Sequence, residues 1–270
     1  MTDIPSHADA AANAAAGVET TIDGPVLTVT LNRPEVRNAQ TPAMWRALAR
    51  VGSSVPANIR VVVLRGRGES FSAGLDRAML GPDGVDGELS FPEMAALGAD
   101  GMDEVIAGYQ EGFTCWRDPR FVSVAAVQGH AVGAGFQLAL ACDLRALADD
   151  AQLCMRETAL GLVPDLGGTK PLVDAVGYTR ALEICATSRW VGAEEAAHLG
   201  LANVVVPREA LENTVSDLAE ALTTPRHEAV TSLKSLLQGA SGRTYDEQRG
   251  AERSAQAERI GSLVRLLSAS

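Results

Sequence analysis

The sequence predicts an α/β core followed by a helical C-terminal region. Two short, continuously apolar segments, RVVVLRG at 60–66 and FVSVAAVQG at 121–129, are typical of strands that are buried on both faces of a sheet. Segments with helical spacing of apolar residues lie between such strands, and from residue 178 onward the sequence is mostly helical in pattern. Strand–helix alternation followed by a run of helices favours this fold class.

The first part of the chain predicts a tail, a pair of strands and a helix. Residues 1–16 are rich in Ala and lack apolar periodicity, which indicates a mobile tail, with a frayed helix as the alternative. Residues 18–34, VETTIDGPVLTVTLNRP, predict two strands joined by an Asp-Gly turn. Residues 41–55, TPAMWRALARVGSSV, have helical spacing, and Thr41 is expected to cap that helix.

The remaining elements divide the chain into a core and a helical end. Enrichment in Gly and Asp over 81–101 predicts a flexible loop that a ligand could order, and a helix is expected near 102–116. We place the α/β core at 17–206 and the C-terminal helical region at 207–270. The helices of that region would pack either on the core of their own chain or on another subunit.

Composition excludes some classes of partner. The chain has 270 residues and a formal net charge of −11, which argues against a nucleic-acid-binding surface. Local Arg or Lys side chains can still bind a phosphate-bearing small molecule. The apolar runs are much shorter than a membrane span, and the N-terminus lacks the pattern of a secretory signal. We therefore expect a cytoplasmic protein without nucleic-acid or membrane partners.

The cysteines give no sign of a disulfide or a metal site. Cys115, Cys142, Cys154 and Cys185 are scattered along the chain and form no CxxC pair. Reduced thiols in the core of a cytoplasmic protein explain this pattern best. The sequence has no spacing typical of metal ligands, so no metal is expected.

A glycine-rich turn at 133–135 opens a helix of small residues within GHAVGAGFQLALAC. The first amides of a helix have no intrahelical partner, and the helix dipole favours negative charge at that end. The amide of Ala134 is therefore a candidate hydrogen-bond donor to an oxyanion. Close packing between helices is the alternative reason for small residues here.

A second small-residue segment, FSAGLD at 71–76, directly follows the strand RVVVLRG. Ligands of open α/β sheets commonly bind at the carboxyl ends of the strands, where this segment lies. The amide of Leu75 is the candidate for a second donor to the same oxyanion. The alternative is a plain turn at the end of the strand, with Asp76 capping the next helix.

These segments, in this order and spacing, resemble those of the crotonase superfamily, also called the enoyl-CoA hydratase/isomerase family. The resemblance spans about residues 16–240 and is sharpest at three places. These are FSAGLD, QGHAVGAGFQLALACDLRAL, and RETALGLVPDLGGTKPL with the downstream VGYTRALEICATSRWVGAEEAAHLGLANVVVP. It implies a spiral of ββα units with a C-terminal helical region, and an assembly as a homotrimer or a dimer of trimers. It also implies an acyl-CoA thioester substrate whose carbonyl oxygen accepts hydrogen bonds from the Leu75 and Ala134 amides.

The resemblance also points to catalytic positions, of which one departs from the pattern. Hydratases of the family place glutamates where this chain has Gln137 and Glu157. A neutral amide at 137 can hold a water or a thioester by hydrogen bonds, but it cannot exchange protons near neutral pH. The two-carboxylate hydration machinery is therefore incomplete.

Asp165, in VPDLGG, offers a replacement carboxylate. An acid at this position resembles those of family isomerases, which move a double bond along the acyl chain through an enolate. We predict that Glu157 and Asp165 exchange the protons, without assigning which is base and which is acid. Taken alone, an Asp in this pattern favours a turn or helix-capping residue. Hydration of a 2-enoyl-CoA is the first alternative activity, and a non-catalytic acyl-CoA binder is the second.

The resemblance implies contacts to CoA from a further set of residues. Arg33 and Arg37 lie in the segment where the family meets the adenine nucleotide and diphosphate, and Arg37 is the better candidate. Lys234, on a C-terminal helix, is predicted to reach a phosphate of CoA bound to its own or a neighbouring subunit, with solvated surface charge as the alternative for these cations. Ala73 and Asp76 complete the predicted CoA-binding set. No cofactor beyond the CoA moiety of the substrate is implied.

Overall fold

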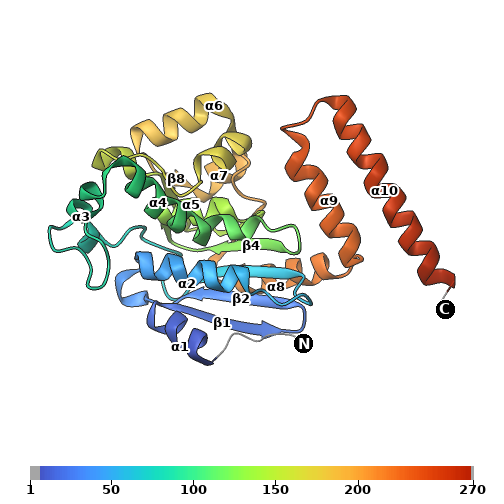
Figure 1. Ribbon diagram of the computed structural model, residues 1–270, viewed down its shortest axis with the longest axis horizontal. Coiled ribbons are helices and arrows are strands. Elements are labelled where there is room, and N and C mark those ends of the chain that lie inside the picture. The colour runs from blue at the N-terminus through green and yellow to red at the C-terminus, as the bar shows by residue number, and fades with distance from the viewer. Residues whose placement is uncertain (1–6, 269–270) are drawn as a thin grey trace.

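The computed structural model describes residues 7–268, which form an α/β body and a projecting helical hairpin (Figure 1). The strands are β1 (Val18–Asp23), β2 (Val26–Leu31), β3 (Val61–Gly66), β4 (Val122–Val127), β5 (His130–Val132), β6 (Leu144–Ala148), β7 (Gln152–Cys154), β8 (Val191–Gly192) and β9 (Val204–Val206). The α-helices are α1 (His7–Ala15), α2 (Pro42–Ser53), α3 (Phe91–Ala96), α4 (Gly98–Thr114), α5 (Ala134–Ala141), α6 (Thr169–Thr187), α7 (Ala193–His198), α8 (Leu211–Thr223), α9 (His227–Ala240) and α10 (Tyr245–Ser268). None of the helices over residues 7–268 is long and apolar enough to cross a membrane.

The larger sheet has six strands in the order β1-β2-β3-β4-β6-β9. The β1–β2 pair is antiparallel, as the Asp-Gly turn between them predicts, and the remaining neighbours are parallel. In register, Val61 of β3 pairs with Val26 of β2 on one side and with Val122 of β4 on the other. The two central strands are buried almost throughout, which confirms the reading of their continuous apolar runs.

A smaller sheet, in the order β5-β7-β8, lies beside the first. The chain passes from a strand of the large sheet to a strand of the small one and then to a helix. It does so over β4, β5 and α5, and again over β6, β7 and α6. This is the predicted spiral of ββα units, and it brings the start of α5 next to the end of β7.

Helices cover both faces of the large sheet. On one face, the largest apolar cluster joins the sheet to α2, α4 and α5 through side chains such as Leu48, Phe113 and Phe136. On the other face, Leu211 and Val215 of α8 pack on the central strands. The first helix of the region predicted at 207–270 therefore belongs to the core of its own chain.

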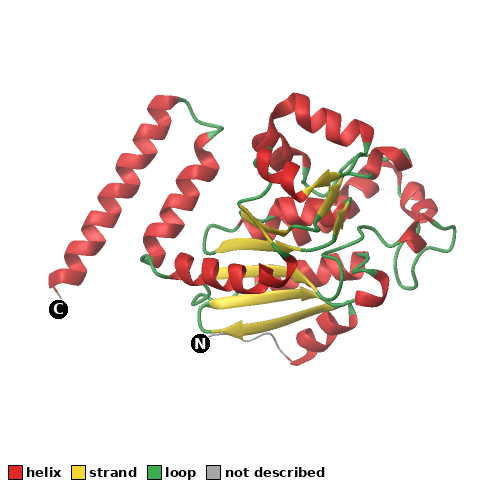
Figure 2. Cartoon of the chain, turned by 180° about the vertical axis from the view of Figure 1, so that it is seen from behind, coloured by secondary structure: helices red, strands yellow, loops and turns green. Residues whose placement is uncertain are grey.

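The last two helices stand apart from the body and run side by side in both views (Figures 1 and 2). They are joined to the body by polar contacts to backbone carbonyls of the segment before β4. His227 Nε2 lies 2.7 Å from the Arg120 oxygen, and Gln238 Nε2 donates to the Arg117 oxygen at 2.7 Å. Lys234, described below, completes this attachment.

Two segments expected to be irregular contain packed helices. Residues 7–15 of the predicted mobile tail form α1, whereas residues 1–6 lie outside the described residues. Asn13 of α1 is 5% exposed and accepts hydrogen bonds from the Arg50 guanidinium at 2.9 and 3.1 Å, so contact with α2 stabilises a helix that has no strong apolar stripe of its own. Within the predicted 81–101 loop, Ser90 and Glu93 form a capping box that starts α3.

Candidate active site

Two backbone segments from distant parts of the sequence lie side by side. The Ser72 amide donates to the His130 oxygen at 2.9 Å, and the Val132 amide donates to the Ser72 oxygen at 3.0 Å. Gly74 has φ +84°, and a β-carbon there would collide with the Val132 carbonyl and lie 3.6 Å from the Ala134 nitrogen. Only glycine allows this approach, which brings the backbone at 74–75 against the start of α5.

The amides predicted to form the oxyanion hole are available for that role. Ala134 is the first residue of α5, and the turn before it is made by Gly133 at φ +50°. Its amide therefore belongs to the helical end that lacks intrahelical acceptors. Around Leu75, the Gln40 amide donates to the Gly74 carbonyl and the Asp76 amide donates to the Gln40 carbonyl, whereas the Leu75 amide has no hydrogen-bond acceptor within residues 7–268. The role of these two amides as donors to one oxygen stays a prediction.

Glu157 lies at this same end of α5. It begins the 3-10 helix η4 (Glu157–Leu160), and a β-carbon on Gly133 would lie 3.3 Å from its Oε1. Burial raises the pKa of Glu157 above that of an ordinary glutamate, and the nearby charge of Asp165 adds to this effect. The nearby backbone amides of residues 156 and 157 and the hydrogen bond from Gln137 lower the pKa and offset part of the increase.

Asp165 lies in the loop between η4 and α6. Burial also raises the pKa of its carboxyl group, and its own amide opposes this. Its carbonyl oxygen accepts a hydrogen bond from Gln110 of α4 at 2.6 Å. Burial thus raises the pKa of both predicted carboxyl groups, and the charge of Asp165 contributes to the increase at Glu157. Gln110 was not found from the sequence, where it is an ordinary position in a helix.

Gln137 is 1% exposed and is held entirely by groups of the protein. Its Nε2 donates to Glu157 Oε1 at 2.7 Å, and its Oε1 accepts from the amides of Leu166 at 2.9 Å and Gly168 at 3.3 Å. The close approach of the 166–168 backbone supplies both donors to the Gln137 oxygen, which leaves the second N–H of Nε2 for another partner. That this side chain holds a water or a thioester stays a prediction.

Three of the predicted CoA-binding residues come together beside the 71–76 segment. The Ala73 amide donates to the Arg37 carbonyl at 2.8 Å, and the Arg37 side chain is exposed. Asp76 accepts from the Ala78 amide and forms an ion pair with Arg33 at 3.1 Å. Asp76 therefore caps the short 3-10 helix that follows, as the alternative interpretation expects. It also lies next to the cationic segment, so the position is compatible with the predicted CoA-binding role.

The structure does not bring Lys234 to this site. Its side chain is 8% exposed, and its Nζ donates to the carbonyl oxygens of Asp118 and Phe121 at 2.7 Å and to Asp143 Oδ2 at 2.6 Å. An ammonium group has three donors, and all three are used within the chain. The prediction that Lys234 binds a CoA phosphate is corrected accordingly: Lys234 anchors α9 to the body.

Comparison with known proteins identifies the family to which this geometry belongs. A family model described as enoyl-CoA hydratase/isomerase matches residues 21–263. The chain belongs to the enoyl-CoA hydratase/isomerase family. The match covers the 71–76 segment, the start of α5 and both carboxylates, so the resemblance predicted from these motifs is confirmed.

Relatives in the family differ in the reactions for which they are named. The chain is 30% identical over 80% of its length to the peroxisomal Delta(3,5)-Delta(2,4)-dienoyl-CoA isomerase of Arabidopsis thaliana, covering 78% of that protein. It is 32% identical over 83% of its length to the carnitinyl-CoA dehydratase of Citrobacter koseri, covering 81% of that protein. A Thermobifida fusca protein, provisionally named as an enoyl-CoA hydratase and solved in complex with CoA, is 48% identical with a TM-score of 0.90. That match covers 98% of this chain and all of the other.

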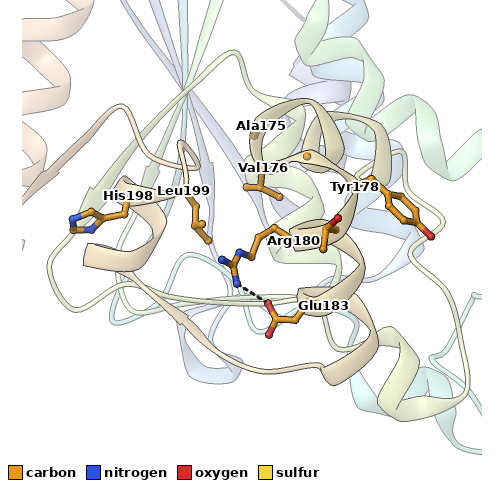
Figure 3. Close-up of a pocket in the computed structure, with 9 residues that line it drawn as sticks. Ala175, Val176, Tyr178, Arg180, Glu183, His198 and Leu199 are labelled. Atoms are coloured by element: carbon orange, nitrogen blue, oxygen red, sulfur yellow. Dashed lines mark ion pairs between the residues drawn. The ribbon is translucent and has the colours of Figure 1, made fainter.

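In this member of the family, a separate hollow of about 610 Å³ lies on α6 and α7 (Figure 3). It is lined by residues 175–180, Glu183, His198 and Leu199. Gly177, at φ +74°, breaks α6 there, and Arg180 faces Glu183 in an ion pair of 3.6 Å. None of the predicted site residues lines this hollow, so it is distinct from the carboxylate pair.

One prediction follows from the buried position of Lys234. The change Lys234→Met leaves Asp143 without its cation in a largely buried setting, and breaking a buried ion pair costs about 3–5 kcal/mol of stability. We expect a correspondingly lower urea midpoint of unfolding and an unchanged dissociation constant for CoA. Wild-type stability combined with weaker CoA binding would restore the phosphate-binding role.

Proposed function

We propose that the protein is an enoyl-CoA isomerase that moves a double bond from C3 to C2 of the acyl chain through a dienolate. The observation that carries this proposal is that residue 137, which has no acid–base capacity, contacts both Glu157 and the backbone next to Asp165, and burial raises the pKa of both of these acids. Two proton-exchanging groups suit a reaction that removes one proton and adds another at a different carbon.

The proposed reaction uses the backbone donors and the carboxylates together. One carboxylate removes a proton from C2, and the electron pair of that C–H bond moves onto the thioester oxygen between the Leu75 and Ala134 amides. The other group, as a carboxylic acid, delivers a proton to C4 while the charge returns from the oxygen. A raised pKa helps both roles, since it makes the base stronger and keeps the acid protonated nearer neutral pH.

An acyl-CoA thioester is the proposed substrate class. One solved structure of the Thermobifida fusca protein contains CoA and another contains acetoacetyl-CoA. The protein in the acetoacetyl-CoA complex is 47% identical to this chain. Arg37, Ala73 and Asp76 are proposed to line the CoA end of the site, because they adjoin the Leu75 donor. A cytoplasmic location is also proposed, supported by four cysteines that are all free thiols.

Hydration of a 2-enoyl-CoA is the second candidate function. It is favoured by the name of the Thermobifida fusca protein and by the carnitinyl-CoA dehydratase relatives. In that case Glu157 activates a water, and Asp165 helps to orient it. A non-catalytic acyl-CoA binder is a third candidate, motivated by the glutamine at 137.

One assay separates these candidates. The purified protein is incubated separately with a 3-enoyl-CoA and a 2-enoyl-CoA, and conjugation and 3-hydroxyacyl-CoA formation are followed. Isomerisation gives the conjugated product without hydration. Formation of 3-hydroxyacyl-CoA at a comparable rate would favour the hydratase, and tight binding without either product would favour the binder.

We also propose that the chain assembles as a homotrimer or a dimer of trimers through its C-terminal region. In support, α9 and α10 leave large apolar side chains exposed, among them Leu233, Leu237, Val264 and Leu267. Light scattering after size-exclusion chromatography is expected to give three or six times the monomer mass of 28.2 kDa. A monomer at micromolar concentration would contradict this assembly.

A further inference from the structure

The two oxygens of the Glu157 carboxylate have different surroundings. Oε1 accepts the hydrogen bond from Gln137 Nε2 at 2.7 Å. Oε2 is buried and has no hydrogen-bond partner of ordinary geometry within residues 7–268. A buried carboxylate oxygen without a partner is costly, and such atoms are uncommon away from functional sites. The carboxylate is thus fixed through one oxygen, while the other stays unbonded.

Gln137 is itself fixed from the opposite end. The amides of Leu166 and Gly168 hold its Oε1, so the side chain cannot rotate its amide without leaving these two donors unpaired. These bonds also assign the amide orientation, because backbone N–H groups require the oxygen on that side and therefore place Nε2 toward Glu157. A β-carbon on Gly168 would lie 2.7 Å from Gln137 Cγ, so the loop packs directly on the side chain.

We propose that Gln137 is a positioning residue that joins Glu157 to the loop carrying Asp165 and presents Oε2 of Glu157 as the oxygen that exchanges the proton. This inference rests on the proposed isomerase function. The same carboxamide that fixes Glu157 also fixes the backbone at Leu166, next to Asp165, so one side chain sets the relative position of both acids.

The proton transfer follows from this arrangement. When Glu157 acts as the base, Oε2 forms the new O–H bond as the C–H bond of the substrate breaks, and the electron pair moves to the thioester oxygen. When Glu157 acts as the acid, the O–H bond at Oε2 breaks and its proton goes to carbon. In both directions Oε1 keeps its bond to Gln137, so the carboxylate need not rotate during turnover.

A glutamate at 137 would not perform this role. Its carboxylate could accept from both loop amides, but it has no N–H to donate to Glu157 Oε1. Two carboxylates would then face each other across that contact, which favours a shared proton. Glutamine gives a donor on one side and an acceptor on the other, as this position requires.

The test measures the titration of Glu157 directly, together with turnover. The full-length protein is labelled with glutamate carrying ¹³C at the carboxyl carbon, and the Glu157 signal is assigned by its loss in Glu157→Gln. Two variants are compared with the wild type: Gln137→Met, which removes all three hydrogen bonds, and Gln137→Glu, which keeps an acceptor for the loop. Gln128→Met is the matched control, because Gln128 is also a buried glutamine but donates to the carbonyls of Gly66 and Gly68.

The donor from Gln137 stabilises the ionised form of Glu157, so its removal raises the pKa of Glu157. We expect the titration midpoint of Glu157 to move to higher pH in both Gln137 variants and to stay in place in Gln128→Met. We also expect kcat for isomerisation to fall by about 100-fold in Gln137→Met, as for a misplaced catalytic group, with little change in KM.

The outcomes distinguish the positioning role from the proposed reaction. A folded Gln137→Met protein with an unmoved Glu157 midpoint overturns the positioning role, even when the wild type is an active isomerase. Shifted midpoints in a protein without isomerase activity support the contact and overturn the reaction. If Gln137→Met does not fold, kcat of Gln137→Glu decides instead, since this variant retains the bonds to the loop: a lower kcat with little change in KM supports the positioning role, and an unchanged kcat overturns it.

Discussion

The variant Glu157→Gln is expected to lower kcat for isomerisation by about 10²-fold or more, the contribution typical of a positioned acid–base group. The amide has nearly the shape of the carboxylate, so CoA affinity is expected to be unchanged. Burial raises the pKa of Glu157 in the folded protein, so the stability linked to this group is fully present below its ordinary pKa and declines as the pH rises through the raised pKa. A neutral glutamine carries no cost of ionisation in this buried place, so the variant is expected to be at least as stable as the wild type.

Steady-state kinetics with a 3-enoyl-CoA and thermal unfolding at pH 7 check both parts of this expectation. Asp165→Asn is the companion variant and is expected to show a loss of similar size, because the proposed mechanism needs both carboxyl groups. A Glu157→Gln protein that retains most of the wild-type kcat would remove Glu157 from the chemistry.

The variant Ala134→Pro is expected to lower kcat by about 10²–10³-fold, because it removes one of the two proposed oxyanion donors and no side-chain chemistry. Ala134 is the first residue of α5, a position where proline fits the helix and where the missing N–H breaks no intrahelical bond. Each such donor is worth about 3–4 kcal/mol of transition-state stabilisation.

Ala134 is 5% exposed, so the proline ring must be accommodated by its neighbours, and circular dichroism and CoA binding are the necessary controls. A substitution to Ser at the same position keeps the amide and tests for the effect of size alone. If the proline variant folds, binds CoA and turns over like the wild type, the Ala134 amide does not hold the thioester oxygen.

The sequence predicted those structural features that depend on residues close together along the chain. The continuous apolar runs of β3 and β4, the Asp-Gly turn between β1 and β2, and the Thr41 cap of α2 all follow from residue type and spacing, and the structure contains each of them. The helix α1 was expected only as the alternative to a mobile tail, because its stability comes from contact with α2 rather than from its own periodicity.

Side-chain direction was the part that the sequence could not give. In the sequence, Lys234 looks like an ordinary surface lysine of a helix. Its burial against Asp143 depends on how α9 packs on the segment before β4. Gln137 was recognised as the departure from the family pattern, but its partners in the 166–168 loop lie about thirty positions away in the sequence. Only the folded chain brings those amides to its oxygen.

The most direct test of the proposed reaction is to find which carbon of the product receives a proton from the solvent. We expect a 3-enoyl-CoA incubated with the protein in deuterated water to yield a 2-enoyl-CoA that carries deuterium at C4, as read by NMR of the product, without 3-hydroxyacyl-CoA. If the protein leaves the 3-enoyl-CoA unchanged but converts a 2-enoyl-CoA into a 3-hydroxyacyl-CoA with deuterium at C2, it adds water across the C2=C3 bond, and this result would contradict proton exchange between Glu157 and Asp165 as the basis of the activity.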